Sequence, residues 1–416
     1  MRYELYKLFR RRMIPIFLIF GLLWVAASGI VPAFQYETYT EDMELLHGLS
    51  AIKYDRELQN TYAGRLAMDE LESLWRECQD IYSDPNYQRE SGIAAGKGNT
   101  TPLTDEAYWK YLRRFGVISA VGTKTYISPL YIDDARKNGD LTELYLGSIV
   151  VLPSEDVLIP AADPNSPIVQ RVIGMYDNLE YPLYGEYYAG WIDFFNTVPF
   201  FFRWIVGPMI VVGLAPVFAD ETSTGCDKLL LTTKYGKSRL IRNKILAALL
   251  YATIIFCAFA LTAVLSYVGC YGLSGLRASI QLLPHGSLSP YNLSIGGAIG
   301  LWGVLGWISA LAIAAIATFF SAVTPNAFAA VIPALTMYIV PSFSCAGLSP
   351  ALHRITRLMP INVIGSIDHI FSVADFYCFF GMLADRKIWI AAVLIAIIFV
   401  FPLLSAVLFL QKEPSK

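Results

Sequence analysis

Long uncharged, apolar runs constrain the fold of this chain more than any other feature. Residues 13–34 contain no charged side chain, and a helix needs about 20 consecutive apolar residues to cross the hydrocarbon core of a bilayer. Similar runs recur in the remainder of the chain. Six candidate transmembrane helices follow from them, at 13–34, 198–219, 245–271, 293–320, 327–347 and 388–410. We therefore expect a mainly α, polytopic helical membrane protein.

The composition supports a membrane protein and argues against metal and disulfide chemistry. The 416 residues are 55% hydrophobic and 16% charged, whereas soluble chains carry about 25% charged residues. The first apolar run is too long for the apolar region of a signal peptide, so we expect it to be retained. The six cysteines form no C-x-x-C pair and the four histidines show no metal-ligand spacing. We therefore predict no metal site and no disulfide framework.

The distribution of Lys and Arg predicts which side of the membrane each connecting segment faces. Six spans place both termini on the same side, and with the termini inside, the inner segments hold thirteen Lys and Arg. These segments are 1–12, 220–244, 321–326 and 411–416. The short outer segments, 272–292 and 348–387, hold only five. Since Lys and Arg accumulate in cytoplasmic loops, we expect a multi-pass protein of the plasma (cytoplasmic) membrane, with both termini cytoplasmic and residues 35–197 outside.

One apolar stretch, residues 358–383, does not fit a simple span. It contains Asp368, His369 and Asp375, and ionisable groups are costly inside a membrane. We favour a re-entrant or interfacial pair of short helices before the last span. A seventh span, which would place the C-terminus outside, is the alternative. Asp368 and His369 fit a helix cap or an interfacial pair better than a catalytic pair, so we predict no catalytic residue.

The long segment between the first two spans, residues 35–197, predicts a mixed, largely helical external domain. Apolar residues recur at roughly helical spacing from Tyr39 to Tyr82, which favours helices, and a second helix is expected over 107–115. Residues 144–152 fit either a strand or a buried helix. The domain carries thirteen basic and twenty-six acidic residues. This excess of carboxylates can attract a cationic peptide or drug, but solubility alone explains it and is the interpretation that we favour.

The N-terminal segment, residues 1–12, predicts an amphipathic helix at the cytoplasmic interface. Leu5, Leu8 and Phe9 recur at helical spacing, and basic residues occupy the other positions around them. A helix with one apolar and one basic face lies in the plane of the membrane surface. A plain basic flank that only stops translocation is the alternative.

The break between the second and third spans, residues 220–244, has an unusual composition. The chain reads FADETSTGCDKLLLTTKYGKSRLIRNK from Phe218 to Lys244. Its acidic start is typical of the beginning of a helix, because carboxylates favour the positive end of a helix. Orientation alone explains its six basic residues, but it does not explain the leucine triplet at 229–231. Exposed apolar side chains beside cations favour a docking surface.

This segment resembles the cytoplasmic segment of the membrane subunit of type-2 ABC exporters, a permease class common in bacteria, especially Gram-positive ones. Members of that family carry an acidic residue, a Gly, a leucine pair, a Ser/Thr-rich turn, a basic patch and a Lys that leads into the third span. The matching positions here are Glu221, Gly225, Leu229, Leu230, Thr232, Thr233, Arg239 and Lys244. The chain departs from many members at Lys234-Tyr235-Gly236, where they have a Pro. The six spans and the short external helices before the last span are also similar to the family layout.

The resemblance implies that residues 220–244 form a coupling helix that docks on a separate ABC ATPase subunit. The chain contains no G-x-x-x-x-G-K-[ST] motif, which is the usual phosphate-binding loop. ATP and Mg²⁺ would therefore be bound by the partner, and this chain would be a transport subunit without a cofactor of its own rather than an enzyme. The family also implies a second permease copy or a related permease as partner, contact with membrane lipid, and no nucleic acid.

The substrate of such an exporter is left open by the sequence. Antimicrobial peptides, drugs, lipids and glycan precursors all fit, and the acidic external domain slightly favours a cationic peptide or drug. The alternative function is a membrane receptor or sensor, whose external domain binds a ligand and whose cytoplasmic loop docks a signalling protein. A neighbouring ATPase gene would favour the exporter, and a neighbouring kinase gene would favour the sensor.

Three further residues are candidates for roles inside the membrane. Arg203 lies in the second span, where it could line a transport pathway, although we favour a side chain that reaches the headgroups. Gly296 and Gly300 lie on one face of the fourth span. Small residues at this spacing permit close helix packing, so we predict a helix interface there, within the subunit or across a dimer.

Overall fold

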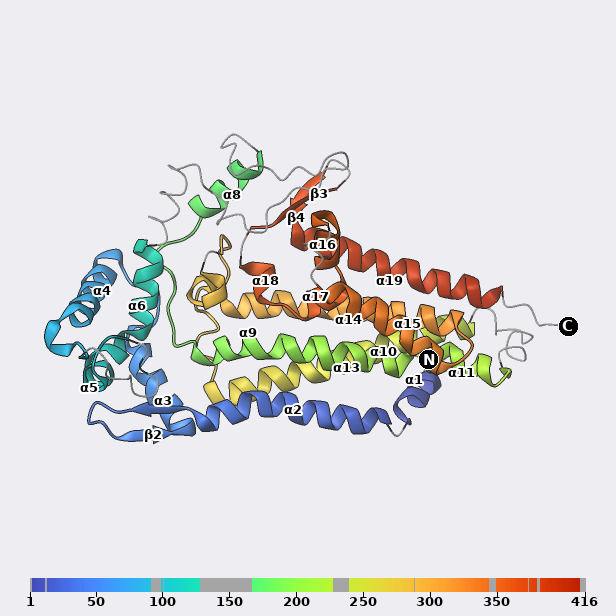
Figure 1. Ribbon diagram of the computed structural model, residues 1–416, viewed down its shortest axis with the longest axis horizontal. Helices are drawn as coiled ribbons and strands as arrows, with labels where there is room; N and C mark the ends of the chain where they lie inside the picture. Colours follow the sequence, from blue (N-terminus) through green and yellow to red (C-terminus); the bar gives the residue numbers. More distant parts are fainter. Residues whose placement is uncertain are drawn as a thin grey trace.

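The computed structural model describes most of the chain, and helices dominate it. The described residues are 2–11, 13–90, 99, 101–127, 167–226, 239–287, 289–343, 349–372, 374–379 and 382–411. The long helices run side by side in an elongated bundle, and a group of shorter helices between residues 48 and 122 extends one end of it (Figure 1). The chain is therefore a helical bundle with a second helical layer at one end.

Five helices in the described part of the chain are long and apolar enough to cross a membrane. They are α2 (Met13–Gln35), the interrupted run Ala189–Ser223, α13 (Ile241–Tyr271), α14 (Ile295–Val323) and α19 (Arg386–Leu410). These five correspond to five of the six predicted spans. The expectation of a mainly helical, polytopic membrane protein is thus confirmed at this level, because length and apolarity meet the requirement of the bilayer.

The second long run is interrupted twice. Helix α9 (Ala189–Phe201) passes through a π-helical turn, η6 (Phe202–Val206), into α10 (Gly207–Leu214), and α11 (Pro216–Ser223) follows. Pro216 has no backbone N–H to donate, so α10 ends just before it and α11 starts with it. The run begins upstream of the predicted start at residue 198 and is longer than a span needs.

The remaining predicted span, residues 327–347, is shorter than expected. Helix α15 (Ala327–Ile339) ends in a 3-10 turn, η10 (Val340–Ser342). At 1.5 Å per residue, Ala327–Ser342 measures about 24 Å, against a hydrocarbon core of about 30 Å. Residues 344–348 lie outside the described residues, so the sixth span stays a prediction.

Helix α14 is the centre of the bundle. It packs against the neighbouring helices α10, α11, α13, α15 and α19. Its buried residues 310–317 consist mainly of alanine, and small side chains allow helices to approach closely. Helices α2 and α19 instead carry many exposed large apolar side chains, as expected for lipid-facing helices. The core is therefore formed around α14.

The described part of the segment between α2 and α9 is largely helical, but it starts with strands where the sequence predicts helices. An antiparallel hairpin of β1 (Glu37–Tyr39) and β2 (Leu45–His47) precedes its helices. The helices that follow are α3 (Gly48–Gln59), η1 (Asn60–Tyr62), α4 (Met68–Ser83), η2 (Pro85–Tyr87), α5 (Asp105–Ala107), η3 (Tyr108–Leu112), η4 (Arg113–Phe115), α6 (Gly116–Gly122), η5 (Thr123–Ile127) and α8 (Pro167–Asp177). The helix expected over 107–115 is thus part of a longer helical run, and residues 144–152 lie outside the described residues.

Buried charge holds this layer together. The carboxylate of Asp55 in α3 is fully buried, and Arg113 donates to it at 2.5 and 3.2 Å. Tyr36 and Thr38 donate to the same carboxylate at 2.6 and 3.1 Å. Because each polar group has a partner, the cost of burying the charge is offset. The end of α2 and the hairpin are thereby joined to the helices that follow.

The segment before α19 contains short elements only, within the residues described there. It consists of α16 (Pro350–Arg357), α17 (Pro360–Ile364), α18 (Asp368–Phe371) and a hairpin of β3 (Phe376–Phe379) with β4 (Met382–Asp385). Short helices occur in this segment, their re-entrant or interfacial placement stays a prediction, and the hairpin was not predicted. Helix α17 reaches into the bundle, where the indole N–H of Trp302 donates to the carbonyl of Ile364 at 3.3 Å. The segment therefore packs against the bundle without a helix long enough to cross it.

Candidate functional site: a buried ion-pair cluster joining helices α1, α11 and α13

Lys244 is the centre of a buried cluster of charges at one end of the bundle. Its side chain, in the first turns of α13, is fully buried. Its Nζ lies 2.6 Å from Glu221 Oε1 and 3.7 Å from Glu4 Oε2, and it donates a hydrogen bond to the carbonyl of Val217. Burial of a charge is costly unless partners surround it, and here two carboxylates and a carbonyl do so. Helix α1 (Arg2–Phe9) contributes Glu4.

The break between α10 and α11 directs Glu221 inward. The first N–H groups of a helix have no partner within the helix, and those of Phe218 and Ala219 donate to Ser321 Oγ of α14 at 2.8 and 3.1 Å. This contact fixes the start of α11 against α14. Glu221 then lies one turn along, buried, with Lys7 Nζ at 3.7 Å from its Oε1. The local backbone thus presents the carboxylate to Lys244.

Helix α1 is attached to the bundle by a third ion pair and by apolar contacts. Arg11, just beyond α1, donates to Asp220 of α11 in a partly exposed pair. Leu8 is buried, and the rings of Phe9 and Tyr251 lie 5.1 Å apart between centroids. The space enclosed beneath α1 is only about 10 Å³, which holds at most one water. Helix α1, α11 and α13 are therefore closely packed here, without room for a ligand.

The structure brings two of the predicted docking residues together and places the others apart. Glu221 and Lys244 form the buried pair. Gly225, with φ +70°, and Arg239 are exposed near the two ends of the segment. Leu229, Leu230, Thr232 and Thr233 lie outside the described residues. Since the charges of Glu221 and Lys244 point into the bundle, they anchor the segment rather than offer a surface to a partner.

Sequence reasoning missed the partners that α1 supplies. Glu4, Lys7 and Arg11 recur at intervals of three and four residues, which places charged groups on one helical face. That pattern was readable in the sequence. Their targets on α11 and α13 lie more than 200 positions away, so no local pattern could have identified them.

The side chain of Arg203 contacts the segment that precedes α19. It lies in η6, and its Nη2 is 3.5 Å from Ser366 Oγ, beyond α17. Both residues line a polar cavity of about 390 Å³. The Nε of Arg203 is buried and has no hydrogen-bond partner among the described residues. Arg203 is half-buried beside the short helices that precede α19, and its headgroup-directed orientation stays a prediction.

The two glycines predicted at a helix interface, Gly296 and Gly300, differ in how closely other residues approach them. A Cβ on Gly296 would lie 2.9 Å from the carbonyl oxygen of Leu276, so this glycine permits a close contact within the chain. A Cβ on Gly300 would meet nothing within 4 Å. Gly300 thus has no close neighbour in the described part of the chain, and a contact across a dimer stays a prediction for it.

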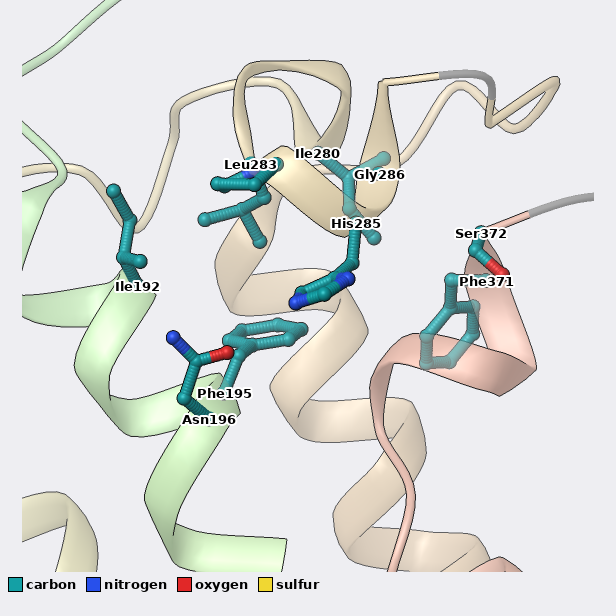
Figure 2. Close-up of a pocket in the computed structure, with 10 residues that line it drawn as sticks. Ile192, Phe195, Asn196, Ile280, Leu283, His285, Gly286, Phe371 and Ser372 are labelled. Atoms are coloured by element: carbon teal, nitrogen blue, oxygen red, sulfur yellow. The ribbon is translucent and has the colours of Figure 1, made fainter.

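A second enclosed space lies between α9, α18 and the turns that precede α14, and it is too small for a ligand. Figure 2 shows the ring of His285 between Phe195, Asn196 and Phe371. The gap measures about 10 Å³, the volume of a single water. Over the described residues, no group of three or more His, Cys, Asp or Glu side chains is placed to hold a metal ion.

Comparison with known proteins adds no relative. No protein-family model, no curated protein and no solved structure matches this chain. The functional argument therefore rests on the geometry of the cluster around Lys244 and on the residues of 220–244.

Proposed function

We propose that this chain is the membrane-spanning permease subunit of an ATP-driven ABC exporter. A separate ATPase subunit binds ATP and Mg²⁺ and docks on residues 220–244. The observation that carries the proposal is the buried contact between Glu221 and Lys244, 2.6 Å long, at the two ends of that segment. This contact joins the two ends of the segment. The segment is therefore held by α11 and α13, the helices that would move during transport.

A loop that transmits force must be firmly attached to the helices that it moves. Separation of Glu221 from Lys244 would leave two buried charges without their nearest partner, which is costly. A push on the loop therefore reaches α11 and α13 together, and α1 through Glu4 and Lys7. A loop that only sets the membrane orientation needs basic residues, but it needs no buried pair. The cluster thus favours coupling over orientation alone.

The proposal assigns different tasks to the parts of the segment. Glu221 and Lys244 anchor it. The exposed end, 223–226, and the residues that follow, with the leucine pair Leu229 and Leu230, contact the ATPase. Residues 35–197 lie outside the plasma membrane and both termini lie in the cytoplasm. A second copy of the chain or a related permease completes the transporter.

Cys226 offers a direct test of the partner and of the orientation. It is exposed at the end of α11. In membranes of cells that express the full chain from its own locus, we expect a thiol-to-amine cross-linker to join Cys226 to an ATPase with a phosphate-binding loop. The variant Cys226→Ser should lose the adduct. An adduct with a kinase or a response regulator instead would favour the receptor alternative.

The same residue reports the orientation. A membrane-impermeant maleimide should label Cys226 only after the membrane is opened. As a matched control, Ser50→Cys, at an exposed position of α3, in a Cys226→Ser background, should react in intact cells. Labelling of Cys226 in intact cells would reverse the proposed orientation.

Coupling is tested in the isolated complex. The double variant Leu229→Ala, Leu230→Ala should weaken co-purification of the ATPase, whereas Glu221→Gln should leave it bound but reduce the stimulation of ATP hydrolysis. Unchanged association and unchanged hydrolysis in both variants would contradict the coupling role.

A further inference from the structure

The polar cavity beside Arg203 has a composition unlike that of the cluster at the other end. It lies where η6, η10, α16, α17 and the start of α19 meet, and its volume of about 390 Å³ falls within the range of ligand pockets, about 300–1,000 Å³. Its polar and charged lining residues are Arg203, Ser342, His353, Thr356, Arg357, Asn362, Ser366 and Arg386. No carboxylate lines it among the residues that the structure describes.

Among the described residues, positive charge exceeds negative charge around this cavity. Asp375, behind the lining, lies 2.7 Å from Arg386 Nη1 and 3.6 Å from Arg357 Nη1. One carboxylate thus contacts two guanidinium groups. Arg203 of η6 contributes a third guanidinium group to the cavity lining. Burial lowers the pKa of Arg357, and the charge of Arg386 lowers it further, although Asp375 opposes this. An anion in the cavity would relieve that repulsion.

Two buried side-chain nitrogen atoms at the cavity have no hydrogen-bond partner among the described residues. Arg203 Nε and His353 Nδ1 make no hydrogen bond within the described chain, and an unmade hydrogen bond at a buried group costs about 1–3 kcal/mol. Asn362 holds the α16–α17 turn in place by donating to the carbonyls of Pro341 and Thr356, each at 2.7 Å. The two nitrogen atoms are therefore held on a fixed frame, as a built binding site requires.

Helix α16 connects the cavity to an apolar surface. His353 and Arg357, one turn apart, face the cavity, while Leu352 and Ile355 on its other side are exposed. Phe343 lines the cavity and is itself 63% exposed. Exposed apolar side chains beside the long apolar helices are suited to contact with lipid chains. A ligand with an anionic head and an apolar tail would match both surfaces.

We propose that this cavity binds the phosphate-bearing headgroup of an anionic amphiphile, with Arg203, His353 and Arg357 as donors. Arginine presents a planar fork of N–H groups that matches two phosphate oxygens. The three side chains that converge on the cavity offer more donors than the single carboxylate of Asp375 can accept from. Binding here does not require an ATPase, so the proposal holds or fails separately from the coupling role.

The test uses the purified full chain in neutral detergent micelles. Phosphatidylglycerol, phosphatidylcholine with the same acyl chains, and inorganic phosphate are titrated, and binding is followed by the shift in the thermal unfolding midpoint and by intact-protein mass spectrometry. We expect phosphatidylglycerol to bind at least ten-fold more tightly than phosphatidylcholine. Arg203→Gln and Arg357→Gln should each weaken it about ten-fold, as expected for one charge-assisted hydrogen bond.

Arg277→Gln is the matched control, because Arg277 is exposed on the loop between α13 and α14, away from the cavity lining. It should leave binding unchanged. Arg203→Lys keeps the charge without the fork and should lie between wild type and Arg203→Gln, which distinguishes lost recognition from misfolding. If inorganic phosphate binds as tightly as the lipid and shows the same dependence on Arg203 and Arg357, the cavity is a phosphate site, and its ligand is a free anion rather than a lipid. Equal binding of the two lipids, or lipid binding that both arginine variants leave intact, would overturn the proposal.

Discussion

The two groups of buried charge in this molecule differ in balance and in the space beside them. Around Lys244, two cations and two carboxylates meet, and the enclosed space is about 10 Å³. Around Arg203, three arginines line a cavity of about 390 Å³, and the one carboxylate behind them, Asp375, contacts Arg357 and Arg386. A neutral, closed cluster holds helices together. A cationic cluster with an open cavity retains binding capacity for an anion.

Removal of the central cation should give the largest effect. Lys244→Met removes the nearest cation from buried Glu221, which keeps only the more distant Lys7, and removes the partner of half-buried Glu4, so we expect the free energy of unfolding in detergent to fall by roughly 3–5 kcal/mol. Arg242→Met, two residues away and exposed, is the control and should change it by less than about 0.5 kcal/mol. The double variant Lys244→Met, Glu221→Gln should recover part of the loss. Equal losses for Lys244→Met and Arg242→Met would remove the distinction between the two clusters.

Removal of a cavity arginine should have a much smaller effect on folding. Arg357→Gln loses the contact with Asp375 but also the repulsion from Arg386, which keeps its own contact with Asp375. We therefore expect the free energy of unfolding of the ligand-free protein to change by less than about 1 kcal/mol, of either sign. The measurement is chemical unfolding after delipidation. A loss as large as that of Lys244→Met would show that the arginines are structural.

Acidification should affect the cavity through His353. Burial and the charges of Arg357 and Arg354 lower the pKa of His353, so the unfolded chain takes up a proton at a higher pH than the folded chain does. Stability of the ligand-free protein therefore falls as the pH drops through the ordinary pKa of about 6.5 toward the lower pKa in the folded state. Among the described residues, Arg203 of η6 and Arg386 of α19 are the other charged groups that line the cavity, and Asp375 lies behind Arg386.

Bound anion should reverse that trend, since a negative headgroup favours protonated His353. Phosphatidylglycerol keeps one negative charge across this range, so we expect its binding to tighten by roughly threefold between pH 7.5 and 5.5. In His353→Gln the affinity should not depend on pH. Equal pH dependence in wild type and His353→Gln would exclude this residue from the site.

The exposed pair of α1 should give the smallest effect. Arg11 and Asp220 are both partly exposed, and such pairs contribute about 0.2–1 kcal/mol. Arg11→Gln should lower the free energy of unfolding within that range, and salt at about 1 M should abolish the difference. A loss of several kcal/mol would mean that α1 is held mainly by this pair rather than by the buried cluster and Leu8.

Sequence reasoning succeeded where one property of a segment was sufficient. The apolar runs of α2, α13, α14 and α19 were readable from composition. It failed where contacts decided the outcome. The hairpin around Leu45, the early end of α15 and the contact of Arg203 with Ser366 all depend on neighbours that local spacing does not encode.

The sequence by itself determined that this chain is a bundle of long apolar helices, because hydrocarbon thickness and the need to satisfy backbone hydrogen bonds within each segment act locally. Only the tertiary structure decided what the charged residues do. Glu221 and Lys244 had looked like parts of a docking surface, and no neighbour of Arg203 could be read from the sequence. Their roles follow from α1, α14 and α17, which folding brings beside them from distant parts of the chain, and a buried charge is stable only where such partners meet.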